Sequence, residues 1–106
     1  MVEVIDRPIG REEALRRLRA LEPELRARGV ESLFLFGSVG RDEATSSSDI
    51  DLFFDKRPGF KLSVFDLIGF GRYLTDTFGR RVDLTLRGGL HPLIREDVER
   101  EAVKVL

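Results

Sequence analysis

The chain has 106 residues, enough for one domain with a single core. Apolar residues make up 42% of it, which argues against disorder, and the absence of cysteine excludes a disulfide framework and a thiolate metal site. Eighteen basic and 19 acidic residues give a formal net charge of −1, so the overall charge does not favour a nucleic-acid backbone. No apolar run is long enough to span a membrane, and no signal peptide is recognised. We expect a cytoplasmic, single-domain protein over residues 1–106, with no membrane and no direct nucleic-acid binding.

The first predicted element is helical. From Arg11 to Arg28, apolar residues recur at spacings of three and four among charged ones, which is typical of a helix with one buried stripe. Pro23 lies inside this stretch, so either the helix kinks there or a second helix begins with the proline in its first turn. Gly29 ends the helical stretch.

Three strands are predicted farther along the chain. Residues 32–36 form a short apolar run, which suits a strand buried on both faces. Residues 49–55 begin with alternating acidic and apolar residues and predict a second strand, adjacent to the first. Residues 82–86 alternate strictly and predict a third strand, in which Asp83 points away from the apolar face.

Two further helices complete the pattern. Residues 62–78, followed by Gly79, predict one between the second and third strands, and residues 91–103 predict the last, with Pro92 in its first turn. His91, the only histidine, is interpreted as shaping the entry to this last helix rather than as a catalytic group. The order of elements predicts an α+β (α/β-like) domain, in which helices flank a small mixed β-sheet of three or more strands.

Three aspartates carry the predicted chemistry. Asp49 and Asp51 lie two positions apart on a strand, so their side chains share a face with α-carbons about 6.6 Å apart. Two carboxylates at this distance repel each other, and a cation beside them offsets the repulsion. Oxygen ligands alone favour a hard cation, Mg²⁺ or alternatively Mn²⁺. If the third strand lies beside the second, Asp83 joins the pair, and the three can hold two metal ions about 3.5 to 4 Å apart. Asp83 is then the best candidate to accept the proton of an attacking hydroxyl.

A Gly-Ser step ends the first strand and fits phosphate chemistry. Gly37 lets a phosphate approach the backbone, and Ser38 can open a helical turn whose free amides and hydroxyl face an anion. Arg41, one turn later, either binds phosphate or anchors its loop to Asp42 or Asp49.

These residues resemble the signature of the nucleotidyltransferase superfamily of the DNA polymerase beta type. That signature is a Gly-Ser pair, a spacer of about a dozen residues, Asp-x-Asp, and a third carboxylate on a later strand. The matching residues are Gly37, Ser38, Asp49, Asp51 and Asp83. The short chain and the residues around the Gly-Ser and Asp-x-Asp motifs are most similar to those of the minimal nucleotidyltransferases. Asp42 departs from the pattern, because many relatives carry glycine there, and this puts the shape of the loop in question.

The resemblance implies the nucleotidyltransferase fold and a prokaryotic antitoxin whose partner is a HEPN-domain toxin. It also implies a magnesium-dependent transfer of AMP from ATP to a tyrosine hydroxyl of that toxin. Asp49 and Asp51 would be metal ligands, Asp83 a ligand and the base, and Gly37 and Ser38 would contact the triphosphate. Once a nucleotide is bound, a domain this small has few residues left to form a pocket for the acceptor, so another chain is expected to supply that surface. We therefore expect a hetero-oligomer, with a homodimer as the alternative.

Several alternatives remain at this point. The chain is either the enzyme just described, or an antitoxin that neutralises its partner mainly by binding, or a small-molecule nucleotidyltransferase similar to aminoglycoside-modifying enzymes. The serines at 46–48 either form a loop that closes over a nucleotide, with Ser48 in contact, or are simply flexible. Five aromatic residues belong either to the core or to an interface: Phe60, Phe65, Phe70, Tyr73 and Phe78.

Overall fold

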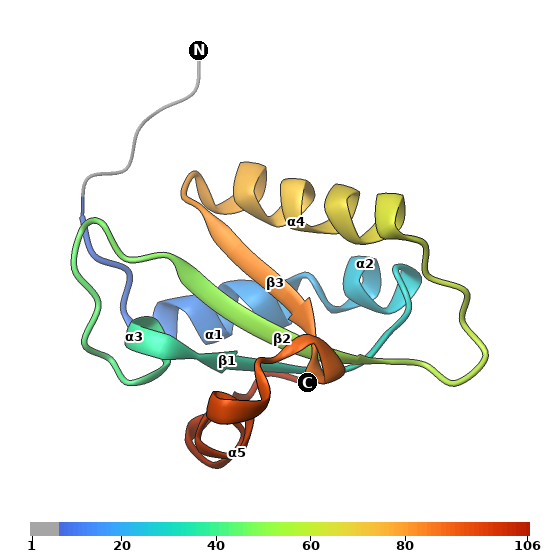
Figure 1. Ribbon diagram of the computed structural model, residues 1–106. Coiled ribbons are helices and arrows are strands. Elements are labelled where there is room, and N and C mark those ends of the chain that lie inside the picture. The colour runs from blue at the N-terminus through green and yellow to red at the C-terminus, as the bar shows by residue number, and fades with distance from the viewer. Residues whose placement is uncertain (1–6) are drawn as a thin grey trace.

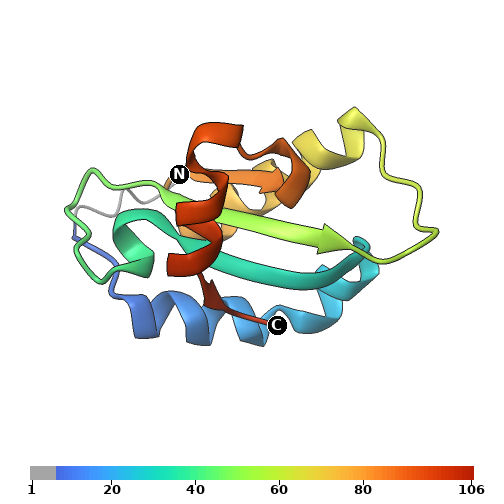
Figure 2. The same cartoon turned by 60° about the horizontal axis from the view of Figure 1, so that its bottom comes forward.

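The computed structural model describes residues 7–106, which form a four-stranded mixed sheet with helices on both sides (Figures 1 and 2). The strands are β1 (Val30–Phe36), β2 (Ile50–Lys56), β3 (Val82–Leu86) and β4 (Val103–Lys104). Their order in the sheet is β3-β2-β1-β4, with β1 antiparallel to β2 and β4, and β2 parallel to β3. The predicted α+β class is confirmed, as are the adjacency of the first two strands and the place of the third beside the second.

The helical stretch before β1 is two helices, α1 (Arg11–Ala20) and α2 (Glu22–Ala27). Of the two alternatives left open, the second is therefore the observed one, with Pro23 in the first turn of α2. A proline is tolerated there because the first amides of a helix have no partner within the helix.

Helix α4 (Val64–Phe78) connects β2 to β3 and begins two residues later than expected, because Ser63 caps it. The Ser63 hydroxyl accepts from the amide of Asp66 at 3.0 Å, and the Asp66 carboxylate accepts from the amide of Ser63 at 3.0 Å. Gly79 ends the helix with a φ of 66°, the left-handed conformation that glycine adopts without penalty.

The main core lies between one face of the sheet and the helices α1, α2 and α4. Alternate residues of β1 and β2 point into it and meet the apolar stripes of the helices. Its fully buried members include Leu33, Leu35, Ile50, Leu52, Phe54, Leu18, Leu25, Phe70, Leu74 and Phe78. Phe70 and Phe78 are thus core residues, whereas Phe65 on the same helix is 84% exposed.

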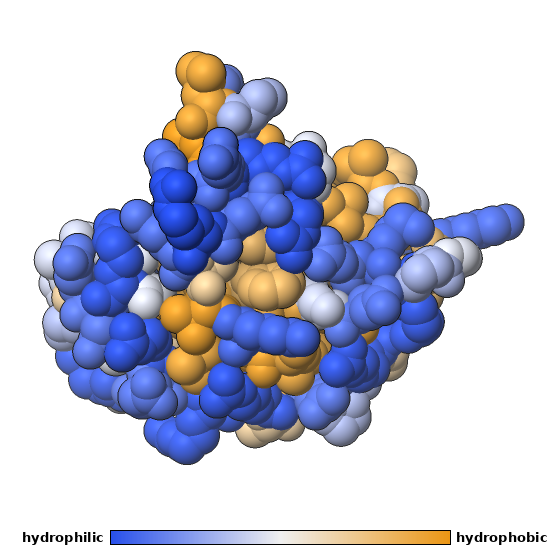
Figure 3. All heavy atoms as spheres, turned by 90° about the horizontal axis from the view of Figure 1, so that it is seen from below, coloured by the Kyte–Doolittle hydropathy of each residue, from blue (hydrophilic) through white to orange (hydrophobic). Residues whose placement is uncertain are grey.

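The opposite face of the sheet is only partly covered, so β1 is not buried on both faces as expected. Leu33 and Leu35 are buried, but Phe34 and Phe36 are half-buried on the other side, where they pack on the ring of Phe53. The cover on this side is α5 (Pro92–Glu101), which crosses part of the sheet (Figure 2). Seen from that side, the surface is mostly hydrophilic, with a smaller apolar area near its centre (Figure 3).

The last predicted helix is wrong at its end. Helix α5 stops at Glu101, and Ala102 is extended, with φ −63° and ψ 144°. Residues 103–104 instead form β4 on the free edge of β1, where Val103 aligns with Leu35, and the following Val105 is buried. Burial of these β-branched side chains against the sheet outweighs one more helical turn. The start of α5 agrees with expectation, because His91 Nδ1 accepts from the amide of Leu93 at 3.1 Å.

None of the helices within residues 7–106 combines the length and the apolar character that a membrane-crossing segment needs.

Candidate active site

The Gly-Ser step lies beside the acidic pair because of the register between β1 and β2. Phe36, the last residue of β1, aligns with Asp51, so the short helix α3 (Gly37–Gly40) begins next to that aspartate. Gly37 has a φ of 72°, and a Cβ at this position would lie 2.2 Å from Asp51 Oδ2. Only glycine satisfies both the backbone and the space, so the turn and the carboxylate are packed as one unit.

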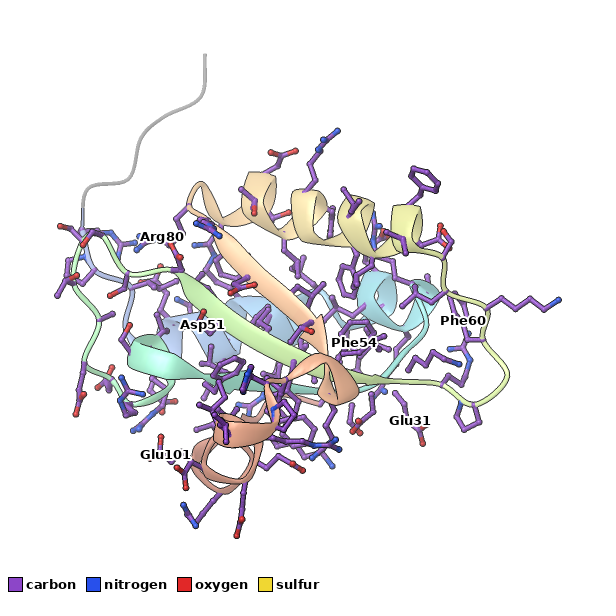
Figure 4. The ribbon with its side chains drawn as sticks, in the orientation of Figure 1. Glu31, Asp51, Phe54, Phe60, Arg80 and Glu101 are labelled. Atoms are coloured by element: carbon purple, nitrogen blue, oxygen red, sulfur yellow. The ribbon has the colours of Figure 1, made fainter. Side chains whose placement is uncertain are left out.

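Asp51 and Asp83 are directly opposite each other on the parallel strands β2 and β3. Aligned residues of neighbouring strands point to the same face, so the two carboxylates share one side of the sheet. Asp49 precedes the first residue of β2 rather than lying within it as predicted, two positions before Asp51. Figure 4 shows Asp51 on β2, at the end of the strand nearest α3. Asp51 and Asp83 therefore lie side by side on neighbouring strands, and Asp49 is near enough for its charge to act on Asp51.

The electrostatics of the site are dominated by Asp51. Burial, and then the negative charges of Asp83 and Asp49, raise its pKa from 3.8 to about 6, while Arg41 and Arg81 act in the opposite direction. No hydrogen bond to the Asp51 carboxylate is found among residues 7–106. A half-buried carboxylate that faces two others is a favourable place for a cation.

The donor set has the chemistry of a site for a hard divalent cation, since all of its ligands are carboxylate oxygens. In the described part of the chain, however, no three acidic, histidine or cysteine side chains stand close enough together to surround a metal ion. Asp49 lies beside a cationic side chain, with its Oδ2 atom 3.8 Å from Arg81 Nε. The residues that would hold a metal are therefore adjacent, but Asp49 is paired with an arginine.

The other predicted contacts are placed as follows. Ser38 is half-buried in α3, one residue from the contact between Gly37 and Asp51. Ser48 lies two residues before β2, and its hydroxyl accepts from the amide of Thr45 at 2.9 Å, so it closes a local turn. Their roles toward a nucleotide stay predictions.

Of the two alternatives for Arg41, a contact that anchors its loop to Asp42 or Asp49 is not observed within residues 7–106. Its guanidinium instead faces Glu43 at 3.3 Å and Glu101 of α5 at 3.9 Å. Both are exposed pairs, which hold a side chain weakly, and Arg41 is near enough to Asp51 to lower that residue's pKa. A role of Arg41 in phosphate binding stays a prediction.

Asp42, which departs from the family pattern, has a structural role. It adopts the left-handed conformation with φ 59°, the conformation for which glycine is the usual residue. Its Oδ1 atom accepts from the amide of Arg11 at 2.9 Å, at the start of α1. The N-cap residue of that helix is Gly10, which has no side chain, so Asp42 supplies the cap from a distant part of the chain.

The partners of two arginines, one near the site and one at the far end of β2, were not predicted from the sequence. Arg81 is the partner of Asp49, and its position directly before the strand that carries Asp83 is a signal that could have found it. Arg87 holds Asp55 through two hydrogen bonds of 2.9 Å and Glu99 of α5 through one of 2.7 Å. Its guanidinium also lies 4.9 Å from the ring centres of Phe34 and Phe53. Arg87 therefore fastens α5 to the sheet.

Comparison with known proteins gives a consistent picture. The model of a family described as nucleotidyltransferase domain matches residues 12–105. A protein adenylyltransferase, MntA, from Thermococcus cleftensis is 38% identical over 91 residues, which is 83% of this chain and 88% of that protein. The Methanocaldococcus jannaschii protein MJ0435, also named as a protein adenylyltransferase, is 34% identical over 88 residues, which is 83% of this chain and 92% of that protein.

Solved structures agree. One named as a minimal nucleotidyltransferase is 34% identical, has a TM-score of 0.72 and covers 90% of this chain and 95% of its own. A toxin-antitoxin structure with AMP-PNP has a TM-score of 0.69 at 18% identity, covering 84% of this chain and 71% of its own, and shows the fold alone. The chain belongs to the nucleotidyltransferase domain family, and its likeness is to the minimal members.

Proposed function

We propose that this minimal nucleotidyltransferase transfers AMP from ATP to a tyrosine hydroxyl of a HEPN-type toxin, with magnesium as the required ion, and so acts as an antitoxin. The observation that carries the proposal is the alignment of Asp51 with Asp83 beside the Gly37 turn. The names of the relatives from T. cleftensis and M. jannaschii support protein adenylylation. The likeness to toxin-antitoxin structures motivates the choice of partner.

The residues divide the chemistry between them. Asp49, Asp51 and Asp83 would hold the divalent cation, which supplies charge neutralisation at the phosphates when bound. Gly37 lets the turn pack directly against the Asp51 carboxylate, so that the backbone of α3 would lie beside the triphosphate, and Ser38 would donate its hydroxyl to a phosphate oxygen. Asp49 would contribute a carboxylate oxygen to the ion beside its weak, exposed contact with Arg81, 3.8 Å away.

The proposed reaction is an in-line displacement at the α-phosphorus of ATP. The tyrosine oxygen forms a bond to the α-phosphorus while the bond from that phosphorus to the bridging oxygen breaks. Pyrophosphate leaves with the electron pair of the broken bond. The proton of the hydroxyl passes to Asp83, the most exposed of the three carboxylates and therefore the one best able to return it to water.

The test is incubation of the purified chain with α-labelled ATP, Mg²⁺ and the purified toxin. Label is expected on the toxin, and it should be lost when Asp49→Asn is combined with Asp51→Asn. Asp76→Asn, an exposed aspartate on α4, is the matched control and should retain transfer. Undiminished labelling by the double variant contradicts the proposed active centre.

The two alternative functions predict different results in inhibition and labelling experiments. An antitoxin that acts mainly by binding inhibits the toxin stoichiometrically without ATP, and the double aspartate variant inhibits as well as the wild type. A small-molecule nucleotidyltransferase labels an aminoglycoside and leaves the toxin unlabelled. Either result replaces protein AMP transfer as the function.

A further inference from the structure

A second surface lies away from the carboxylates, at the end of the sheet where β2 leaves for α4. Three apolar side chains on the first turns of α4 are strongly exposed: Val64 at 71%, Phe65 at 84% and Ile68 at 55%. Two hollows of about 330 and 590 Å³ open beside them and share Phe60 and Leu62 in their walls. Figure 4 shows Phe60 at the opposite end of the sheet from Asp51. We call this surface the α4 face; it consists of Phe60, Leu62, Val64, Phe65, Ile68 and Gly69.

Two glycines in α4 favour an external contact for this face. A Cβ at Gly69 or at Gly71 would meet nothing within 4 Å, so packing inside the chain does not require glycine at either position. Glycine inside a helix costs about 1 kcal/mol relative to alanine. Bare backbone beside exposed apolar side chains lets the surface of another molecule approach closely.

The charge around the α4 face selects the kind of partner. Residues 56–72 carry four basic side chains and one acidic one, although the whole chain has a net charge of −1. The acidic one, Asp66, is engaged in the capping box with Ser63, which holds its pKa below the usual range. A second copy of the chain in a symmetric contact would place these basic groups against each other. A partner with carboxylates around an apolar side chain is complementary.

Nucleic acid fits the same surface less well. The basic loop and Phe60 would suit a phosphate backbone with a stacked base. Val64 and Ile68, however, are aliphatic, and their exposure is relieved by apolar side chains rather than by bases. The observations therefore favour a protein.

We infer that the α4 face is the docking surface for an acidic partner protein, which inserts an apolar side chain between Phe60 and Phe65 and flanks it with carboxylates near Lys56 and Lys61. For the identity of the partner this rests on the proposed function, which makes it the toxin. Lys56 is five positions from Asp51 along β2, about 17 Å in an extended strand. The docking surface is thus separate from the reacting atoms, and a partner of the size of one domain can contact both.

The test is titration calorimetry of the purified chain with the purified toxin at two salt concentrations. Phe65→Ser combined with Ile68→Ser should weaken binding by at least about 30-fold, the loss typical of central interface residues. Leu93→Ser on α5 is the matched control, because Leu93 is 85% exposed on a different face, and it should bind as the wild type. Lys61→Glu should weaken binding more at low salt than at high salt. Circular dichroism and urea unfolding verify that each variant is folded.

Each outcome decides the inference. Wild-type affinity in the double variant overturns it, as does an equal loss in Leu93→Ser. A wild-type dimer in light scattering that the double variant dissociates assigns the face to a second copy, and binding of a fluorescent single-stranded RNA that Lys61→Glu abolishes assigns it to nucleic acid; either result overturns the inference. No binding by the wild type overturns the partnership and the inference together. Binding that depends on Phe65 without any AMP transfer leaves the inference standing and refutes the catalytic proposal.

Discussion

Asp51→Asn is expected to abolish AMP transfer and yet to stabilise the metal-free protein. The substitution keeps the size of the side chain and removes a negative charge that burial, Asp83 and Asp49 all disfavour, as the raised pKa of about 6 shows. Asparagine at this position resembles the protonated aspartate. The cost of holding the charge is therefore removed together with the proposed metal ligand.

The magnitude follows from the shift. Between 3.8 and about 6, each pKa unit corresponds to about 1.4 kcal/mol, which gives an upper limit of about 3 kcal/mol. Asp51 is only half-buried, and solvent screening reduces this to about 1 to 2 kcal/mol. Because the folded-state pKa is raised, the native state binds more protons than the unfolded chain inside this window. Wild-type stability therefore falls as the pH rises from about 4 to about 6.

The assay is urea unfolding of both proteins in chelator at pH 7.5 and at pH 4. The asparagine variant should be more stable by about 1 to 2 kcal/mol at pH 7.5, and the difference should shrink to a small part of that at pH 4, where Asp51 is protonated in the folded protein and partly protonated in the unfolded chain. Addition of Mg²⁺ at pH 7.5 should stabilise the wild type alone. A variant that is less stable at pH 7.5, or a gain that is undiminished at pH 4, refutes the reasoning.

Three further predictions concern Gly37, Asp42 and Arg87. Gly59→Ala, at positive φ, should cost about 1 kcal/mol in urea unfolding and keep ATP binding, because a Cβ there meets nothing within 4 Å. Gly37→Ala should cost more and should lose ATP binding, because its Cβ would lie 2.2 Å from Asp51 Oδ2. Asp42→Ala should cost about 2 kcal/mol, since it removes the acceptor for Arg11 and leaves alanine at φ 59°, whereas Asp42→Gly should cost less. Arg87→Met should cost about 2 kcal/mol and speed amide exchange in α5, because it leaves two carboxylates without their shared partner.

Each of these has its own refutation. Equal ATP binding by the two alanine variants removes the special role of Gly37. An Asp42→Gly variant less stable than Asp42→Ala shows that the left-handed backbone carries no strain there. Unchanged exchange of the α5 amides in Arg87→Met shows that the helix is held by other contacts.

The strands and the acidic cluster could be predicted because they depend on local, alternating patterns. Two-residue periodicity defines the faces of β2 and β3, and the alignment of Asp51 with Asp83 then follows from their adjacency in the sheet. The fourth strand could not be predicted, because residues 103–104 are too few to show a period and are defined by the free edge of β1. Tertiary pairing decided what local preference left open.

The partners of Arg41 and Arg87 could not be predicted for a different reason. Long, flexible side chains take their partners from whatever the fold brings near, as Arg41 does with Glu101, and spacing does not encode such pairs. Asp42 is similar, since its partner amide at Arg11 is 31 positions away. Their chemistry is readable from the residue type, but their partners are not.

Because of the contact between Gly37 and Asp51, the residue that fits at position 37 depends on the residue at position 51. As long as the carboxylate is kept, no larger residue fits at position 37. Oδ2, Cγ and Cβ of Asp51 would lie 2.2, 3.0 and 3.2 Å from a Cβ at position 37, so the steric demand ends only when the whole side chain at position 51 is gone. A chain that differs at both positions is therefore expected to keep the fold while it lacks both the proposed metal ligand and the turn packed against it.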